Sequence, residues 1–122
     1  ALEIALGIAQ QNNANVALLH VIEIVEHIPF DEMKSFYGKL ENAARERLGF
    51  PASMFLEKGL VVDPDVVYGN RTEEIVKYAT SNGVDLIVLS SHRISAEQPT
   101  KGWGSISHKV ALFSQCPVLL VK

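Results

Sequence analysis

The last third of the chain alternates between segments typical of a strand and of a helix, and this alternation limits the possible folds most. Residues 84–90 form an apolar run of strand length, and after a polar loop Gly104 and Ser105 open a short helix that ends near Ser114. Residues 117–121 supply a second apolar strand. A strand that feeds a helix through a loop is where open α/β sheets bind phosphate, because the helix start offers unpaired N–H groups and a dipole that favours negative charge.

Helical spacing recurs in the first half of the chain. Residues 1–11 place apolar side chains at positions i, i+3, i+4 and i+7, which predicts a helix. Asp31 is the predicted N-cap of a second helix that reaches about Leu48. Its apolar stripe contains Met33, Phe36, Tyr37, Leu40, Ala44 and Leu48. Pro51 and Gly59 predict a linker after this helix.

Two further strands and one more helix complete the pattern. Residues 16–22 form a nearly continuous apolar run, as expected for a strand that is covered on both faces of a parallel sheet. A strand is also predicted within residues 60–68, with Pro64 at a sheet edge or at a bulge. The helix that follows begins at Asn70 or Thr72.

The order of these elements predicts an α/β fold. Helices and strands alternate from the first residue to the last, which indicates a parallel sheet with right-handed crossovers and helices beside it. Such a chain ordinarily begins with a strand, whereas this one begins within an amphipathic helix at Ala1. We therefore expect a strand of roughly six residues before Ala1.

Composition narrows the class of protein. The chain has 122 residues, of which 48% are apolar, and this fits one domain with a hydrophobic core. The net charge is −3 and lysine and arginine form no basic run, which argues against a nucleic-acid partner. No apolar run approaches the roughly 20 residues that span a membrane. The single cysteine, Cys116, excludes an intrachain disulfide and is typical of a reducing cytoplasm.

Four segments, taken together and in order, resemble the universal stress protein family. They match the family's second strand, the entry to its third helix, its fourth strand, and its final helix start and strand. At the family's spacing they cover essentially the whole domain, residues 1–122. The segments are residues 16–21 (VALLHV), 68–75 (YGNRTEEI), 83–92 (GVDLIVLSSH), and the pair Gly104 and Ser105 followed by 116–121 (CPVLLV).

The resemblance implies an open five-stranded parallel sheet of strand order 3-2-1-4-5 with helices on both faces. The strand expected before Ala1 would be the central one. The resemblance also implies homodimers that pair their last strands antiparallel, here the segment from Pro117 to Val121. It further implies a cytoplasmic stress-response domain that binds ATP or another adenine nucleotide, accompanied by Mg²⁺, in a regulatory and non-catalytic role.

The nucleotide motif of the family, G-x-x-G, nine residues, then G-S or G-T, is only partly kept. Its first glycine falls on Ser90, its second on Arg93, and its final pair on Gly104 and Ser105. Ten residues, 94–103, precede that pair, one more than in the family. If φ is positive at Arg93, the side chain costs roughly 1–2 kcal/mol. Its guanidinium either binds a phosphate or fills the empty phosphate site.

By the same resemblance, eight residues form the nucleotide site. Val21 would offer backbone groups to adenine, and His92 lies at the mouth of the fourth strand. Ser105 either binds phosphate or only caps its helix. The full set is Val21, Leu89, Ser90, His92, Arg93, Gly104, Ser105 and Ile106. No catalytic or metal-binding residue is predicted, because the four histidines have no partner at ligand spacing and no side chain is an evident general base.

Three other functions stay open at this point. A non-nucleotide-binding member of the family would act as a homodimerisation or partner-docking module, with Arg93 plugging its cleft. An ATP-consuming enzyme of the related adenine-nucleotide hydrolase group is a more distant alternative, since its phosphate loop would lie outside this chain, and slow ATPase activity stays open. A flavodoxin-like flavin carrier would show a similar order of elements.

Overall fold

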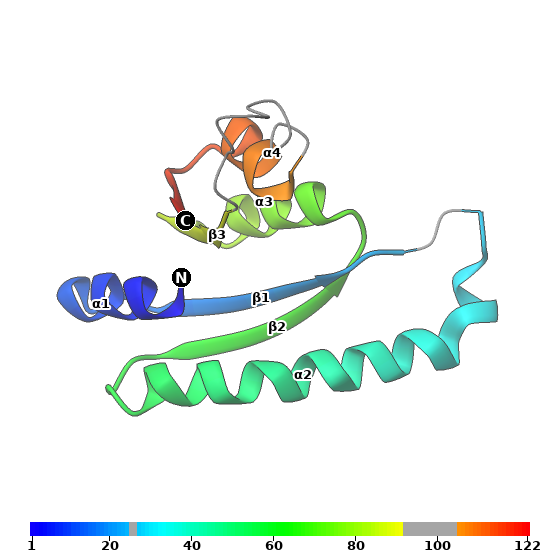
Figure 1. Ribbon diagram of the computed structural model, residues 1–122, viewed down its shortest axis with the longest axis horizontal. Helices are drawn as coiled ribbons and strands as arrows, with labels where there is room; N and C mark the ends of the chain where they lie inside the picture. Colours follow the sequence, from blue (N-terminus) through cyan, green and yellow to red (C-terminus); the bar gives the residue numbers. More distant parts are fainter. Residues whose placement is uncertain (25–26, 92–104) are drawn as a thin grey trace. The chain divides into compact units, whose positions relative to one another are not determined.

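The computed structural model describes residues 1–24, 27–91 and 105–122 (Figure 1). Helices and strands alternate and the strands pair in parallel, which confirms the predicted α/β class. The elements are α1 (Leu2–Asn12), β1 (Val16–Ile22), η1 (Phe30–Met33), α2 (Lys34–Leu56), β2 (Val62–Tyr68), α3 (Arg71–Ser81), β3 (Ile87–Ser90), α4 (Ile106–Phe113) and β4 (Val118–Val121). They form two compact units, the N-terminal unit (Leu2–Asn70) and the C-terminal unit (Arg71–Lys122, with Ala1).

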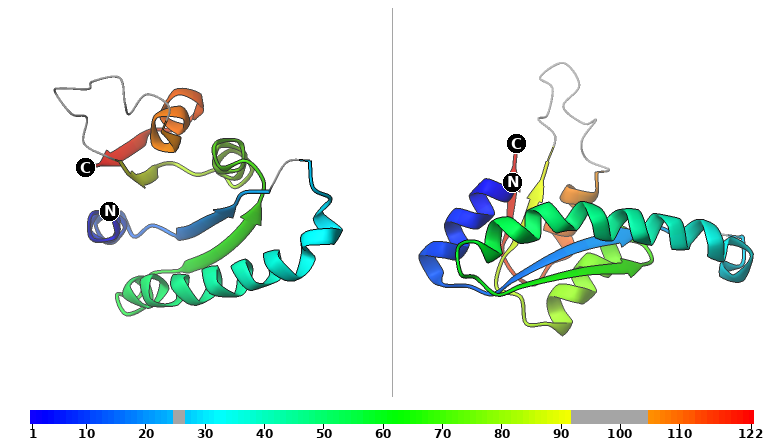
Figure 2. Two further views of the ribbon diagram at one scale, coloured as in Figure 1. Left: turned by 45° about the vertical axis from the view of Figure 1, so that its right-hand side comes forward. Right: turned by 90° about the horizontal axis from the view of Figure 1, so that it is seen from below.

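The N-terminal unit is built on the parallel pair of β1 and β2, with α2 running along it (Figures 1 and 2). The register aligns Val16 with Val62 and Ile22 with Tyr68. Two clusters of buried side chains join α2 to the rest of the unit, one toward each end of the strands. The first comprises Ile22, Tyr37, Ala44 and Val66, and the second comprises Ala9, Phe55 and Leu60.

The start of α2 differs from the prediction. Asp31 lies inside the 3-10 turn η1, and Met33 occupies the N-cap of α2 without a side-chain hydrogen bond. The predicted Asp31 cap is therefore wrong. The 3-10 turn already directs the chain into the helix, and its Glu32 N–H donates to the carbonyl of Pro29 over 3.1 Å.

The end of α2 also differs from the prediction. The helix continues past Leu48 and through Pro51 to Leu56, so Pro51 does not begin a linker. A proline inside a helix costs about 3 kcal/mol, because it removes one backbone hydrogen bond and crowds the preceding turn. Ala52 and Phe55 are buried, with exposed fractions of 7% and 0%. Their burial against the rest of the unit stabilises the extra turns and offsets that cost.

Two residues of the stripe predicted for α2 lie on its exposed side. Tyr37 and Ala44 are buried, as predicted, but Phe36 is 49% exposed and Leu40 is 38% exposed. One residue step turns a helix by about 100°, so Phe36 leaves α2 to the side of Tyr37, and its ring reaches back to contact the Tyr37 ring with the centroids 5.6 Å apart. The stripe prediction is therefore wrong for Phe36 and Leu40.

The turn into β2 and the strand itself agree with the prediction. Gly59 adopts a φ of +76° in the turn after α2, a conformation that favours glycine. Pro64 lies opposite Leu18 in a continuous register, without a bulge. Among the described residues β2 pairs only with β1, so Pro64 stands on an edge strand, where a missing N–H is tolerated.

The C-terminal unit is built on the parallel pair of β3 and β4. Ile87 pairs with Val118 and Ser90 with Val121, so the ladder covers only the last four residues of the strand predicted at 84–90. α3 and α4 pack together, and Val110 of α4 is fully buried. α3 begins at Arg71, between the two predicted starts, Asn70 and Thr72.

Both strand pairs are neighbours in the strand order that the family resemblance implies. β1 with β2 corresponds to strands 2 and 3, and β3 with β4 corresponds to strands 4 and 5. The complete order, the covering of both faces by helices and the strand expected before Ala1 stay predictions. Within the described ranges, no helix is long and apolar enough to cross a membrane.

Candidate functional site

The carboxyl end of β3 is the first part of the candidate site. Ser90 is the last residue of the strand and is exposed, while Leu89 is half-buried within it. The next residue, Ser91, donates its backbone N–H to the carbonyl of Val121 over 2.8 Å. This bond extends the ladder between β3 and β4 to the edge of the sheet, where open parallel sheets bind ligands.

The start of α4 is the second part. Ser105 is the N-cap, with φ −67° and ψ 155°, and its hydroxyl accepts a hydrogen bond from the backbone N–H of His108 over 3.3 Å. Ile106 is the first helical residue. The capping role predicted for Ser105 is therefore confirmed, and a role in binding phosphate stays a prediction.

Ser107 joins these two parts and was not singled out in the sequence. It is the buried polar residue of the described core, with an exposed fraction of 7%. Its hydroxyl donates to the hydroxyl of Ser91 over 3.2 Å and lies 3.2 Å from the hydroxyl of Ser105. We call Ser91, Ser105 and Ser107 the serine cluster. The sequence feature that could have pointed to Ser107 is its position two residues after Ser105 at the helix start. Spacing alone, however, does not predict burial.

The serine cluster and the start of α4 suit an anion in four respects. Hydroxyl groups can turn to donate to an anion, and the first turn of a helix has N–H groups without a partner inside the helix. The first turn of α4 contains no acidic residue that would repel negative charge. The helix dipole adds a partial positive charge at this end. The arrangement can therefore bind phosphate, but it offers no general base for chemistry.

The remaining predicted site residues fall into two groups. His92, Arg93 and Gly104 lie outside the described residues, so the predictions for them stay predictions. Val21 belongs to β1 of the N-terminal unit and has an exposed fraction of only 5%. Its side chain is part of the core, as one reading of the sequence expected, and only backbone groups are left for a ligand. In the described part of the C-terminal unit, the Ser107–Ser91 hydrogen bond joins the end of β3, which contains Leu89 and Ser90, to the start of α4, which contains Ser105 and Ile106.

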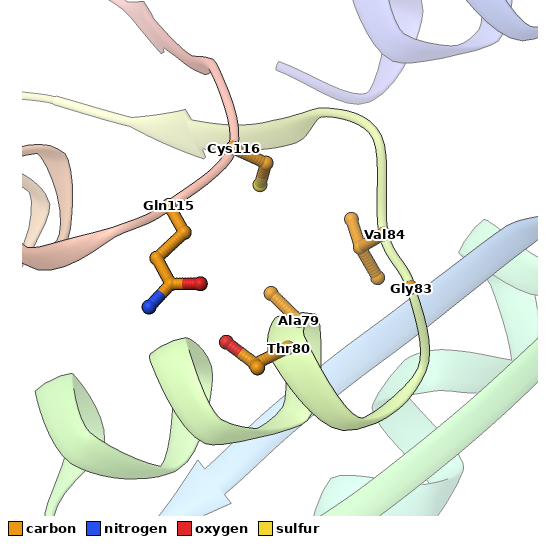
Figure 3. Close-up of a pocket in the computed structure, with 6 residues that line it drawn as sticks. All are labelled: Ala79, Thr80, Gly83, Val84, Gln115 and Cys116. Carbon is orange, nitrogen blue, oxygen red and sulfur yellow. The ribbon is translucent and has the colours of Figure 1, made fainter.

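A hollow in the C-terminal unit lies at the amino ends of the strands, whereas a phosphate ligand is expected at their carboxyl ends (Figure 3). Gly83 and Val84 precede β3, and Cys116 precedes β4, so the hollow lies at the amino ends of both strands. Its volume of about 200 Å³ is below the roughly 300–1,000 Å³ of typical ligand pockets. Its lining residues are Ala79, Thr80, Gly83, Val84, Gln115 and Cys116.

No metal centre is visible in the part of the chain that the structure describes. Within residues 1–24, 27–91 and 105–122, no three His, Cys, Asp or Glu side chains gather closely enough to hold a metal ion. The serine cluster contributes neutral hydroxyl groups only, which are poor sole ligands for a divalent cation.

Comparison with known proteins identifies the family. The model of the universal stress protein family matches residues 1–122. The chain is 31% identical to universal stress protein YxiE of Bacillus subtilis (strain 168), with 100% of this chain and 88% of that protein covered. It also matches the solved structure of the protein MJ0577 with a TM-score of 0.72 and 31% identity, covering 98% of this chain and 86% of that one.

A more distant structure shares the fold. The universal stress protein of Archaeoglobus fulgidus in complex with dAMP matches with a TM-score of 0.69 and 18% identity, covering 99% of this chain and 84% of that one. The family model covers every residue of the chain, and the relatives cover nearly all of it. This chain belongs to the universal stress protein family.

Proposed function

We propose that this domain binds an adenine nucleotide at the carboxyl end of β3 and the start of α4. ATP is the primary candidate. The observation that carries the proposal is the serine cluster, in which Ser105 caps α4 and Ser107 ties it to Ser91. Hydrogen bonds to a charged group contribute roughly 1.5–3 kcal/mol each, so the Ser105 hydroxyl and the N–H groups at the helix start would together add substantially to the binding of a phosphate. The dAMP complex of the Archaeoglobus fulgidus relative supports the choice of ligand.

The eight predicted residues receive roles in this proposal. Gly104, Ser105 and Ile106 bind the phosphates with backbone N–H groups and the Ser105 hydroxyl. Leu89, Ser90 and His92 lie along the ribose. Val21 offers its backbone to the adenine base, and Mg²⁺ arrives as part of the nucleotide complex.

Arg93 decides how tightly the phosphates are held. A guanidinium binds phosphate through two parallel hydrogen bonds, and this would offset the loss of the glycine that the motif has here. In that case Arg93→Gly weakens ATP binding. If the guanidinium instead fills the phosphate site, the same substitution creates or strengthens binding.

The proposed role is regulatory, as a cytoplasmic stress-response domain that binds the nucleotide without turning it over. We also propose a homodimer in which two copies pair their last strands antiparallel, from Pro117 to Val121. In the described sheet β4 pairs only with β3, so its other edge has backbone groups that a second copy can meet.

Isothermal titration with ATP, carried out with and without Mg²⁺, tests the nucleotide proposal. We expect saturable heat with one site per chain, and Ser105→Asp as a control that places a negative charge against the phosphates. Absence of heat at high micromolar protein would remove the proposal. A parallel assay of ATP hydrolysis tests the non-catalytic role, and sustained phosphate release would contradict it.

The second candidate function is a docking module of the same fold that binds no nucleotide. It is favoured by Leu112 and Phe113, which end α4 with exposed fractions of 71% and 65%. Neighbouring apolar side chains that are this exposed often mark a protein interface. A chain that gives no heat with ATP but remains a dimer, and becomes monomeric as Leu112→Asp, would establish this function instead.

A further inference from the structure

A second apolar line on α2 runs beside the buried one. It comprises Phe36, Leu40, Ala43 and Phe50, and we call it the lateral stripe. Phe50 is 74% exposed, more than either Phe36 or Leu40. Phe36 and Ala43 each lie one residue before a buried residue, Tyr37 and Ala44, so the stripe is turned sideways from the buried line by about 100°. It therefore faces along the surface of the N-terminal unit, where it is open to a neighbour beside α2.

The spacing of the lateral stripe is that of a helix-pairing seam. Its positions follow one another at steps of four and three residues, with Arg47 filling the one polar position between Ala43 and Phe50. This 3.5-residue repeat is what two packed helices need, because it keeps the same line of side chains facing a partner.

The charged residues next to the lateral stripe are self-complementary, because they can pair with the same residues of a second copy. Lys39 and Glu46 lie on its solvent side, seven residues apart, which is about 10.5 Å along the axis and too far for an ion pair within the helix. Elsewhere on the same helix Arg45 pairs with Glu41 over 3.5 Å. No ion pair of Lys39 or Glu46 with another described residue is found. Their opposite charges can be satisfied by a second helix that runs in the opposite direction.

We propose that the lateral stripe binds a second copy of this chain, with the two α2 helices antiparallel. In the register that pairs Leu40 with Ala43 of the second copy, Lys39 of each copy meets Glu46 of the other, so both ion pairs form about one two-fold axis. The same register places Arg47 of one copy against Phe36 of the other, where a guanidinium can lie over the ring. A parallel pair would bring neither charge opposite its complement.

This contact differs from the strand-pairing dimer proposed above and does not depend on nucleotide binding. All of its residues lie in α2, within the N-terminal unit, whereas the serine cluster and β4 lie in the C-terminal unit. A chain that used both contacts would form assemblies larger than a dimer. A chain that used only one would stop at the dimer.

Charge reversal provides the test, read by sedimentation equilibrium of the whole chain. Lys39→Glu and Glu46→Lys each replace two attractions by two repulsions, and we expect either variant alone to lower self-association roughly fivefold to thirtyfold. An equimolar mixture of the two variants restores four opposite charges, so association should return and be stronger at low salt. Restoration in the mixture also shows that both variants are folded.

Lys58→Glu is the matched control, because it makes the same change of charge at an exposed lysine beyond the end of α2. It should associate like the unaltered chain. Association through another surface is common to every sample and does not respond to mixing. The proposal is overturned if the unaltered chain is monomeric at all concentrations, if the single variants associate normally, or if the mixture behaves like its components.

Discussion

The hydroxyl of Ser107 donates to the hydroxyl of Ser91 over 3.2 Å and thereby ties the first turn of α4 to the carboxyl end of β3. Ser91 is in turn bonded through its N–H to the carbonyl of Val121, 2.8 Å away. The helix start is thus connected to both strands of the C-terminal sheet. A start that is held in this way presents its N–H groups in one fixed direction, which lowers the entropy that the protein would otherwise lose on binding an anion.

Ser107→Ala should destabilise the chain by about 1 kcal/mol, the net value of one or two buried hydrogen bonds. The substitution removes the bond to Ser91 and the contact with Ser105, while alanine fits the space and suits a helix. Urea unfolding measures the change in the free energy of unfolding. Ser81→Ala, at an exposed position of α3, should change it by less than about 0.5 kcal/mol. Equal effects at both positions would contradict a role of the Ser107 bonds.

Substitutions of Ser105 separate its capping from its proposed phosphate contact. Ser105→Ala should cost about 1 kcal/mol of stability, because the N–H of His108 loses its acceptor. Ser105→Asp retains a capping oxygen and should keep the stability, yet its charge opposes a phosphate at short range. We expect ATP affinity to fall at least tenfold in both variants, measured by titration calorimetry. If the Asp variant binds ATP normally, Ser105 only caps α4 and does not contact the phosphates.

Phe55 and Phe50 stand five residues apart on α2 and should respond very differently to truncation. Phe55 is 0% exposed, whereas Phe50 is 74% exposed. Phe55→Ala leaves a cavity beside Ala9 and Leu60 and should cost about 3–5 kcal/mol in the free energy of unfolding. Phe50→Ala should change it by no more than about 0.5 kcal/mol in dilute solution. Similar losses in the two variants would mean that the end of α2 does not pack as described.

Tyr68 should make the stability of the N-terminal unit fall at alkaline pH. Burial raises the pKa of its phenol above the ordinary value of 10.0, the Glu41 carboxylate raises it further, and the Arg45 guanidinium opposes them. The unfolded chain then releases this proton at a lower pH than the folded chain does. The stabilising effect is complete below about pH 10 and is lost as the pH rises through the higher folded value.

Tyr68→Phe tests this expectation. The variant loses the hydrogen bond from the Tyr68 hydroxyl to the carbonyl of Tyr37, 3.3 Å away, and should be about 0.5–1.5 kcal/mol less stable at pH 8. Its stability should fall less steeply than that of the unaltered chain between pH 9 and pH 11, followed by denaturant unfolding. Parallel pH profiles for the two proteins would argue against a raised pKa of Tyr68.

Much of the secondary structure could be predicted because its signals are local. The strand predicted at 16–22 is β1, and the last helix begins after Ser105 and ends before Ser114, as predicted. An apolar run of strand length and a capping serine act within a few residues of chain. Tertiary contacts therefore alter the boundaries of these helices and strands only slightly.

The length of α2 could not be predicted in this way. Pro51 is a local stop signal, yet the helix continues because Phe55 is buried against Ala9 and Leu60, residues that lie before β1 and after the helix. Similarly, Tyr37 and Phe36 are equally apolar neighbours, and only the position of the sheet decides that the first is buried and the second exposed. Burial depends on partners that are remote in sequence.

The sequence by itself determined the family, the alternation of helices and strands, and the capping serine of α4, because each of these depends on residue type and short-range spacing. Only the tertiary structure revealed the serine cluster and the lateral stripe. Ser107 links α4 to β3 because the fold brings Ser91, sixteen residues earlier in the chain, within hydrogen-bond distance. The lateral stripe is left uncovered because the sheet packs against the adjacent face of α2. Both features follow from which surfaces the fold brings together, and that is a property of the packed chain.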